Sequence, residues 1–188
     1  TALMTTPFKS FSINSLQSLF ENAGMSTFRA KQMLEWVYVR NAVGYDQMTN
    51  IPKGVREQFE CAFPLYTPAV IDKQISCDGS RKYLLQYHDG AIVETVGLPS
   101  FDGRLSVCCS SQVGCAMGCL FCATGRNGFT RNLVAGEIVD QVLAVQKDFG
   151  ERVTNVVIMG QGEPFANYDE TIAALHIMND PKLLNIGA

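Results

Sequence analysis

The stretch VCCSSQVGCAMGCLFCATG, Val107 to Gly125, holds five of the seven cysteines of the chain. Within it, Cys115, Cys119 and Cys122 form the pattern C-x-x-x-C-x-x-C, on what we expect to be one loop between a strand and a helix. Three thiolates can hold three irons of a cubane 4Fe-4S cluster, and the fourth iron then lacks a protein ligand. The pattern therefore predicts an iron–sulfur centre with one coordination position open to a substrate.

A structural zinc site is the alternative interpretation of the same cysteines, with Cys108 or Cys109 as the fourth ligand. Zinc sites more commonly use separated C-x-x-C pairs than one compact triplet. The bulky Phe121, directly before Cys122, also suits a zinc turn poorly. The spacing therefore favours iron and sulfur over zinc.

The bulk composition is that of a globular protein, with 188 residues, 47% of them hydrophobic and 18% charged. No apolar run approaches the about 20 residues of a membrane-spanning helix, and the first ten residues do not resemble a secretory signal. We therefore expect a cytoplasmic protein without a membrane partner. Because that compartment is reducing, clustered cysteines there indicate metal binding or catalysis rather than structural disulfides.

Charge gives only a weak indication of a partner. The net charge is −3, yet residues 101–133 carry three basic residues and one acidic residue. Nucleic-acid-binding proteins usually present a broader basic face than this. The local excess is consistent with a polyanion near the cysteines and does not establish one.

The first 66 residues predict a small helical domain. Apolar residues recur at helical spacing in residues 13–24, which end in a glycine, and in residues 26–40, which begin with Ser26 or Thr27 as the cap. A third helix is expected after Pro52, a residue that suits a first helical position.

Strand patterns follow this helical domain. Residues 67–100 contain β-branched and aromatic runs separated by two Asp-Gly turns, which predicts a three-stranded antiparallel ribbon from about Ala69 to Leu98. From residue 101 onward, strands alternate with helices, as in parallel βαβ units. Only two such units precede Ala188, too few to close a barrel or to cover a sheet, so we expect an α/β fold in which residues 101–188 are part of a longer protein.

A second motif lies one βαβ unit beyond the cysteine triplet. NVVIMGQGEP, Asn155 to Pro164, ends an expected buried strand in glycines followed by Glu163. Ligands bind at the carboxyl ends of parallel strands, where glycine lets the backbone approach a ligand and a carboxylate can receive an ammonium group. On its own, the motif is equally consistent with a plain tight turn.

The triplet, with an aromatic residue before Cys122, resembles the signature of the radical S-adenosylmethionine (SAM) superfamily, and GQGEP resembles the superfamily's GGEP element. Longer strings resemble the RlmN and Cfr group of RNA adenine methyltransferases almost residue for residue. These strings are FRAKQMLEWVY (28–38), SCDGSRKYLLQYHDGAIVETVGLP (76–99), CCSSQVGCAMGCLFCATGRNGFTRNL (108–133) and VVIMGQGEPFANYDETIAAL (156–175). GFTRNL and the proline of GEP are more similar to the RlmN type.

The resemblance implies a fold and an activity. The fold would be a helical accessory domain and a β-extension followed by the start of a partial (β/α)6 barrel. The activity would be radical SAM methylation of carbon 2 of adenine in 23S ribosomal RNA and tRNA, through a methyl-cysteine that lies outside this chain. This chain alone would therefore be inactive. Methylation of carbon 8, as in the Cfr type, and a noncatalytic metal-binding RNA module are the alternatives.

The resemblance also implies cofactors and partners. Cys115, Cys119 and Cys122 would hold a 4Fe-4S cluster, and Gly162 and Glu163 would hold SAM by its amino acid end. The cluster and SAM would together generate a deoxyadenosyl radical. The partners would be ribosomal RNA, tRNA and an external electron donor such as flavodoxin or ferredoxin, and we expect a monomer.

Two further residues receive roles from the same resemblance. Cys108 matches the family's second catalytic cysteine, which resolves the protein–RNA adduct by forming a disulfide bond with the methyl-carrying cysteine; a cation such as Arg104 would favour its thiolate. Glu94 matches a glutamate assigned as a proton acceptor. The simpler interpretations are a buried apolar position for Cys108 and a solvent-facing strand position for Glu94.

Polar residues after the triplet remain ambiguous at this stage. They either contact phosphate or the SAM carboxylate, or they support the start of the next helix, and they are Arg126, Asn127, Arg131 and Asn132.

Overall fold

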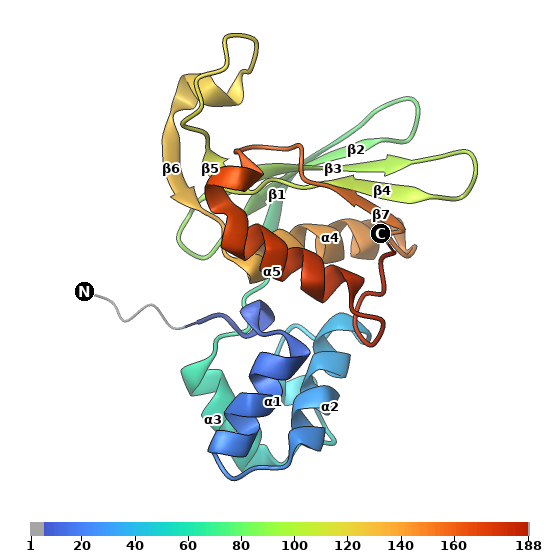
Figure 1. Ribbon diagram of the computed structural model, residues 1–188. Helices are drawn as coiled ribbons and strands as arrows, with labels where there is room; N and C mark the ends of the chain where they lie inside the picture. Colours follow the sequence, from blue (N-terminus) through green and yellow to red (C-terminus); the bar gives the residue numbers. More distant parts are fainter. Residues whose placement is uncertain (1–5, 188) are drawn as a thin grey trace.

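The structure is a computed structural model that describes residues 6–187, apart from the side chain of Asn127. Its first part is a helical module of three α-helices, α1 (Ile13–Asn22), α2 (Thr27–Tyr38) and α3 (Lys53–Ala62), below a sheet (Figure 1). Short 3₁₀ helices cover Phe8–Ser10 and Tyr45–Gln47. All three predicted helices are confirmed.

Capping explains where these helices begin and end. The hydroxyl of Ser12 accepts a hydrogen bond from the N–H of Ser15 at 3.1 Å and so caps α1, and Gly24 follows that helix with φ +68°. Ser26 occupies the predicted cap position of α2, but its side chain makes no capping hydrogen bond. Pro52 lies one residue earlier than predicted, as the N-cap of α3.

An aromatic cluster forms the core of the helical module. The rings of Phe20 and Phe59 lie 4.9 Å apart between centroids, and Phe8 meets Tyr45 edge-on at 5.8 Å. The residues predicted at helical spacing on α2 are buried: Ala30, Met33, Leu34, Val37 and Tyr38. Burying each large apolar side chain contributes roughly 1.5–3 kcal/mol, so this core is the main source of the module's stability.

A five-stranded mixed sheet follows, in the order β1-β2-β3-β4-β7. The predicted antiparallel ribbon is present as β1 (Ala69–Ile75), β2 (Arg81–Gln86) and β3 (Ile92–Pro99). It continues without a break, because β3 pairs with β4 (Leu105–Cys108) and β4 pairs in parallel with β7 (Asn155–Val157). The boundary predicted between residues 100 and 101 therefore lies inside one hydrogen-bonded sheet, and the division into domains stays a prediction.

A small hairpin interrupts what we expected to be a simple loop from strand to helix. Strand β5 (Gln112–Gly114) pairs antiparallel with β6 (Phe129–Asn132). The three cysteines of the triplet lie between these strands. The cysteine loop, residues 115–122, therefore projects from a hairpin whose two ends are fixed.

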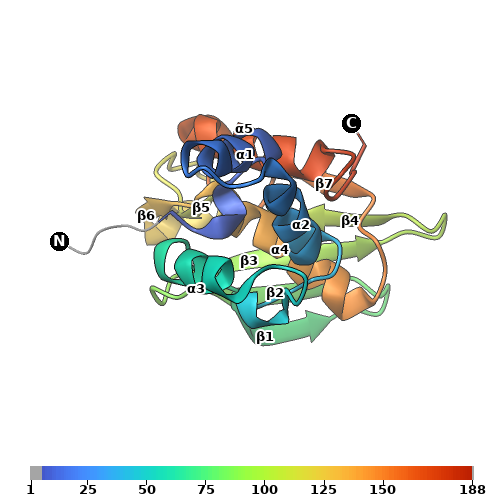
Figure 2. The same cartoon turned by 90° about the horizontal axis from the view of Figure 1, so that it is seen from below.

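Two helices cover one face of the sheet, between the sheet and the helical module (Figures 1 and 2). They are α4 (Ala135–Phe149) and α5 (Tyr168–Asn179), both predicted. Gly97 lets α4 approach β3 closely, since a Cβ atom at this position would lie 2.6 Å from the ring of Phe149. The α/β fold class with an incomplete barrel portion is therefore confirmed.

The opposite face of the sheet carries no helix from the described residues (Figure 1). Along β3, Val93 and Thr95 point toward α4 and are buried, whereas Glu94 and Val96 point to the other face and are partly exposed. We call this second face the open face. Within residues 6–187, no helix combines the length and apolar character that crossing a membrane requires.

Candidate functional site

The loops that follow β4 and β7 are joined by backbone hydrogen bonds. The N–H of Gly160 donates to the carbonyl of Cys109 at 2.9 Å, and the N–H of Ser111 donates to the carbonyl of Gln161 at 2.8 Å. The hydroxyl of Ser110 accepts from the N–H of Gln161 at 2.9 Å. The start of the cysteine hairpin and the glycine-rich loop therefore lie side by side at the carboxyl ends of parallel strands, where α/β folds bind ligands.

Gly162 is required by this close approach. Its φ is +97°, and a Cβ atom there would lie 2.6 Å from the Cβ and 2.7 Å from the backbone N of Gln112. Any other residue would be strained in backbone and would collide with β5. The structure thus brings Gly162 to the cysteine hairpin, as the predicted site requires.

Glu163 begins the short 3₁₀ helix Pro164–Asn167. Its carboxylate accepts a hydrogen bond from the N–H of Phe165 at 3.0 Å, and its own N–H donates to Oε1 of Gln112 at 2.9 Å. The backbone around Glu163 is therefore fixed from both sides, while the carboxylate remains partly exposed. A fixed, accessible carboxylate can receive a ligand's ammonium group.

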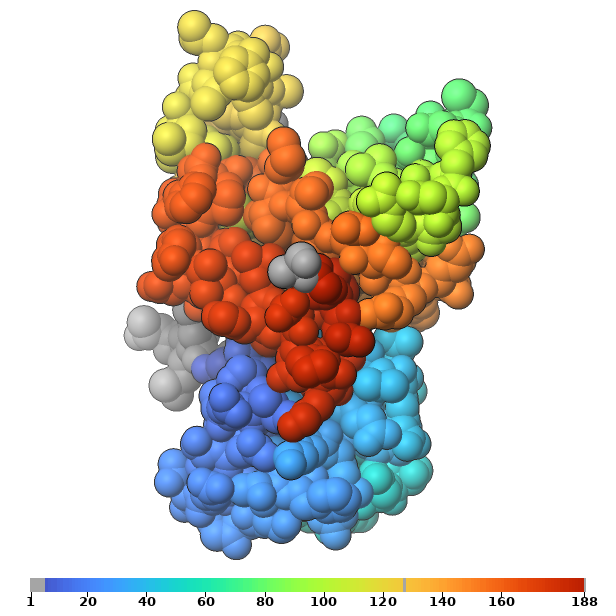
Figure 3. Space-filling model, turned by 45° about the vertical axis from the view of Figure 1, so that its right-hand side comes forward, coloured from blue at the N-terminus to red at the C-terminus, as the bar shows by residue number. Residues whose placement is uncertain are grey.

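The three predicted cluster ligands share one projecting loop. Cys115 is buried next to the end of β5, Cys119 is exposed and Cys122 is partly exposed. Figure 3 shows this segment, in yellow, standing out from the rest of the surface. Leu120 and Phe121 at its tip are 98% and 94% exposed.

The donor set of this loop fits an iron–sulfur cluster. Thiolates are the ligands that such clusters use, and N–H groups of Gly125 and Thr124 that bond to the sulfur of Cys122 lower the pKa of that thiol. No three His, Cys, Asp or Glu side chains converge in a metal-binding arrangement within the described part of the chain. The fit therefore rests on ligand chemistry and on the shared loop.

Glu94 and Cys108 lie on the open face, on adjacent strands. Cys108 pairs in register with Val96, which is two residues beyond Glu94 on β3. Glu94 forms an ion pair with Lys82 at 3.3 Å, and its side chain is 43% exposed. The two residues therefore share one accessible surface that begins at the carboxyl end of β4.

The environment of Cys108 differs from the cationic one that the sequence suggested. Burial raises the pKa of Cys108, and a hydrogen bond from the N–H of Met159 only partly opposes this effect. Arg104 pairs with Asp102 at 2.7 Å. Burial therefore favours the protonated thiol of Cys108, and a reaction at its sulfur needs a base to remove that proton.

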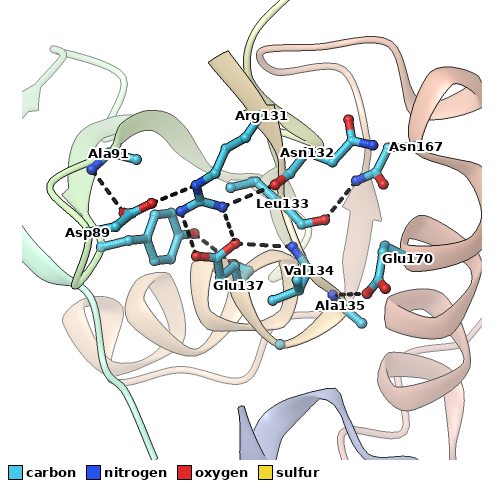
Figure 4. A network of polar contacts seen from close by, with 12 residues as sticks. Asp89, Ala91, Arg131, Asn132, Leu133, Val134, Ala135, Glu137, Asn167 and Glu170 are labelled. Carbon is cyan, nitrogen blue, oxygen red and sulfur yellow. Dashed lines mark hydrogen bonds and ion pairs between the residues drawn. The ribbon is translucent and has the colours of Figure 1, made fainter. Parts of the chain in front are cut away.

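Arg131 lies at the centre of a network of polar contacts that supports the fold (Figure 4). Its guanidinium donates to both carboxylate oxygens of Glu137 at 2.7 and 2.8 Å, and to Asp89 at 2.7 Å. These bonds join β6 to the first turn of α4 and to the turn between β2 and β3. Arg131 therefore supports the start of the next helix, which is one of the two roles that the sequence left open. Asn132 bonds to the side chain of Gln112.

Buried polar residues that were not predicted from the sequence organise these loops. The amide of Gln141, on α4, bonds to both the N–H and the carbonyl of Ser110, at 2.7 and 2.8 Å. Asn167 donates to the carbonyls of Ser111 and Leu133. Two features of the sequence could have indicated these contacts. One is a glutamine on the apolar face of a helix, and the other is the polar run SSQ soon after a strand.

Two protein families match separate parts of the chain. The ribosomal RNA large subunit methyltransferase N-terminal domain matches residues 8–63, and the radical SAM superfamily matches residues 109–186. The first range covers the helical module, and the second contains the cysteine loop and the loop of Gly162 and Glu163.

Curated proteins and a solved structure are similar over most of the chain. Proteins described as a probable dual-specificity RNA methyltransferase RlmN share 46% identity in Synechococcus sp. and 47% in Bacillus velezensis, over 93% and 95% of this chain. A crystal structure of a radical SAM methyltransferase from Sphaerobacter thermophilus superposes with a TM-score of 0.88 at 39% identity, over 97% of this chain and 55% of that one. The chain spans about half the length of the curated relatives, 49% and 50% in these two cases.

Proposed function

The chain belongs to the RlmN family of radical SAM proteins, and on that premise we propose that the complete protein methylates carbon 2 of adenine in 23S ribosomal RNA and in tRNA. The relatives described as dual-specificity RNA methyltransferases support an RNA substrate. The match of residues 8–63 to a ribosomal RNA methyltransferase domain supports it independently.

One observation carries the proposal. Backbone hydrogen bonds hold the loop of Gly162 and Glu163 against the start of the hairpin that bears Cys115, Cys119 and Cys122. The three cysteines would hold a 4Fe-4S cluster, and Gly162 and Glu163 would receive the amino acid end of SAM. When bound, the cluster and SAM supply an electron and the methyl carbon.

Glu94 and Cys108 would act on the nucleic acid from the open face. The carboxylate of Glu94 is accessible and can accept a proton from the adenine. Cys108, once deprotonated, would release the product by attacking the sulfur of a methyl-carrying cysteine outside this chain. The bond from that sulfur to the methylene carbon of the RNA adduct would break as the disulfide bond forms, and the methylene carbon would take a proton to become the methyl group. All seven cysteines are unpaired in the described residues, which leaves Cys108 free for such a step.

The remaining requirements concern partners. The proposal requires an external one-electron donor of the flavodoxin or ferredoxin class, because the cluster would have to be reduced before SAM is cleaved. The helical module would help to bind folded RNA by shape and backbone contacts. A monomeric state and a cytoplasmic location remain predictions.

Mass spectrometry of methylated RNA tests this function. Anaerobically reconstituted full-length protein, given a reductant and SAM, is expected to produce 2-methyladenosine in 23S ribosomal RNA fragments and in tRNA. Formation of 8-methyladenosine would assign the Cfr-type activity instead. A colourless zinc protein that neither cleaves SAM nor methylates RNA would indicate a noncatalytic RNA-binding module.

A further inference from the structure

We infer that Gln112 is a positioning residue that sets the cysteine hairpin and the SAM-binding loop at a fixed separation. The inference rests on the proposed function, because it assigns this role at the site where SAM would bind. Gln112 is the first residue of β5 and lies three positions before Cys115. It is 3% exposed, and although it lies within the quoted cysteine stretch, the sequence analysis assigned it no role.

Both the oxygen and the nitrogen of the Gln112 side-chain amide make hydrogen bonds. Oε1 accepts a hydrogen bond from the N–H of Glu163 at 2.9 Å, and Nε2 donates to Oδ1 of Asn132 at 2.8 Å. Asn132 is the last residue of β6, the second strand of the hairpin. A single amide therefore links the SAM-binding loop to both strands that carry the cysteine loop.

The backbone near Gln112 adds to the same link. The N–H of Gln112 donates to the carbonyl of Gln161 at 3.2 Å, and Gly162 lies so close that it has no room for a Cβ atom. Because Glu163 is held by Gln112 on its N–H and by Phe165 at its carboxylate, it cannot shift independently of β5. The contact between the two loops is thus specified by side-chain and backbone atoms together.

This link matters because SAM would have to meet two protein elements at once. Its amino acid end would contact both the open position of the cluster and the loop of Glu163. A displacement of about 1 Å at supporting residues is enough to impair a site of this kind. The side chain of Gln112 is spent on hydrogen bonds to Glu163 and Asn132, so its effect is on geometry.

Three substitutions in the full-length reconstituted protein test the inference. Gln112→Leu removes both hydrogen bonds. Asn132→Ala removes only the bond to Nε2, at an exposed position where folding is not at risk, and Asn132→Asp keeps an acceptor for that bond. Tyr83→Phe, which removes a hydrogen bond to Asp148 far from both loops, controls for a general loss of stability.

The measurements are SAM affinity, the change that SAM produces in the electron paramagnetic resonance spectrum of the reduced cluster, and hydrogen exchange of residues 160–166. We expect iron content to stay at the parent level in all variants. The dissociation constant for SAM should rise about tenfold in Gln112→Leu, which removes both hydrogen bonds, and about threefold in Asn132→Ala, which removes one of them. Asn132→Asp and Tyr83→Phe should stay within twofold, and exchange of the Glu163 amide should accelerate only in Gln112→Leu and Asn132→Ala.

Two results would overturn the inference, and they differ in what else they imply. If Gln112→Leu and Asn132→Ala bind SAM within twofold of the parent with an unchanged spectrum, the positioning role is wrong and the proposed function stands. If the parent itself shows no spectral change with SAM, the proposed function fails and the inference fails with it. Should Gln112→Leu not fold, the comparison of Asn132→Ala with Asn132→Asp decides.

Discussion

Glu94, the proposed proton acceptor, contributes little to the stability of the fold. Its one ion pair within residues 6–187, to Lys82, is exposed on both sides, and exposed pairs contribute at most about 1 kcal/mol. Strand β3 is held by its neighbours and by α4, not by this carboxylate. A substitution at Glu94 can therefore test function without disturbing structure.

We expect Glu94→Gln to keep iron content and SAM cleavage at the parent level while RNA methylation falls at least a hundredfold, a typical loss for a general base. Lys82→Met is the matched control, because it breaks the same ion pair and keeps the carboxylate. Deoxyadenosine release and methylated RNA are measured in the same reactions. Normal methylation by Glu94→Gln would remove this residue from the mechanism.

Among single residues, the sequence predicts a role only for those whose spacing along the chain is typical of a known kind of site. Cys115, Cys119 and Cys122 have the spacing that is typical of iron–sulfur cluster ligands, so their proposed role can be predicted without a structure. Gln112 cannot, because its two side-chain partners lie 20 and 51 positions away and only the fold brings them together. The environment of Cys108 was misjudged for the same reason, since its burial depends on neighbouring strands.

At the scale of elements, hydrophobic periodicity predicted the helices and the longer strands. It missed β5 and β6, which have three and four residues and a register shift between Val113 and Gly114. Strands this short carry no readable alternation. Strand β7 is also shorter than its apolar run, because Gly160 and Gln161 leave the sheet to bond with the loop after β4.

Asp148, near the end of α4, ties that helix to β1 and β2. It accepts hydrogen bonds from Lys73 at 2.8 Å, Arg81 at 2.7 Å and Tyr83 at 2.9 Å. Burial alone would raise the pKa of Asp148, but these three donors outweigh burial and lower the pKa to about 2. The folded state therefore favours the ionised carboxylate.

This lowered pKa makes stability depend on pH. The contribution of Asp148 is fully present above the pKa of the unfolded chain, near 4, and is lost as pH falls through about 2. Asp148→Asn should therefore lower the free energy of unfolding by about 1–2 kcal/mol at pH 7 and by much less at pH 2.5. Urea denaturation at both values measures this, with exposed Glu57→Gln as the control. An equal loss of unfolding free energy at pH 7 and pH 2.5 would show that the ionisation of Asp148 does not contribute to stability.

At the scale of the whole molecule, a buried ion pair fastens the helical module to α4. Lys9, in the first 3₁₀ helix, bonds to Asp140 on α4 and to the carbonyl of Tyr66 at 2.9 Å, while Tyr38 donates to the carbonyl of Lys9 at 2.9 Å. The Lys9 and Asp140 side chains are each 6% exposed. Nothing in the sequence around Lys9 indicated this contact, because its partner lies 131 positions away.

Removing Lys9 should destabilise the protein in a pH-dependent manner. Burial raises the pKa of Asp140 to about 6, and Lys9 opposes that rise. In Lys9→Met the pKa rises further, so an ionised Asp140 is penalised most at pH 8, where the expected loss is about 3–5 kcal/mol, and least at pH 5. Thermal unfolding at both pH values measures the effect.

The double variant Lys9→Met with Asp140→Leu is the control, because it removes both buried charges. It should recover most of the stability at pH 8. A Lys9→Met variant that loses the same stability at pH 5 and pH 8 would show that packing, not charge, fastens the module.

The paired strands β5 and β6 allow the cysteine hairpin to form without a bound metal. The N–H of Cys115 donates to the carbonyl of Gly128 at 2.9 Å, and the β5–β6 ladder closes the same segment, so polypeptide atoms alone bring the ends together. We therefore expect the hairpin to fold without the proposed cluster, so that protein prepared from iron-starved cells is folded and takes up iron and sulfide on later anaerobic reconstitution.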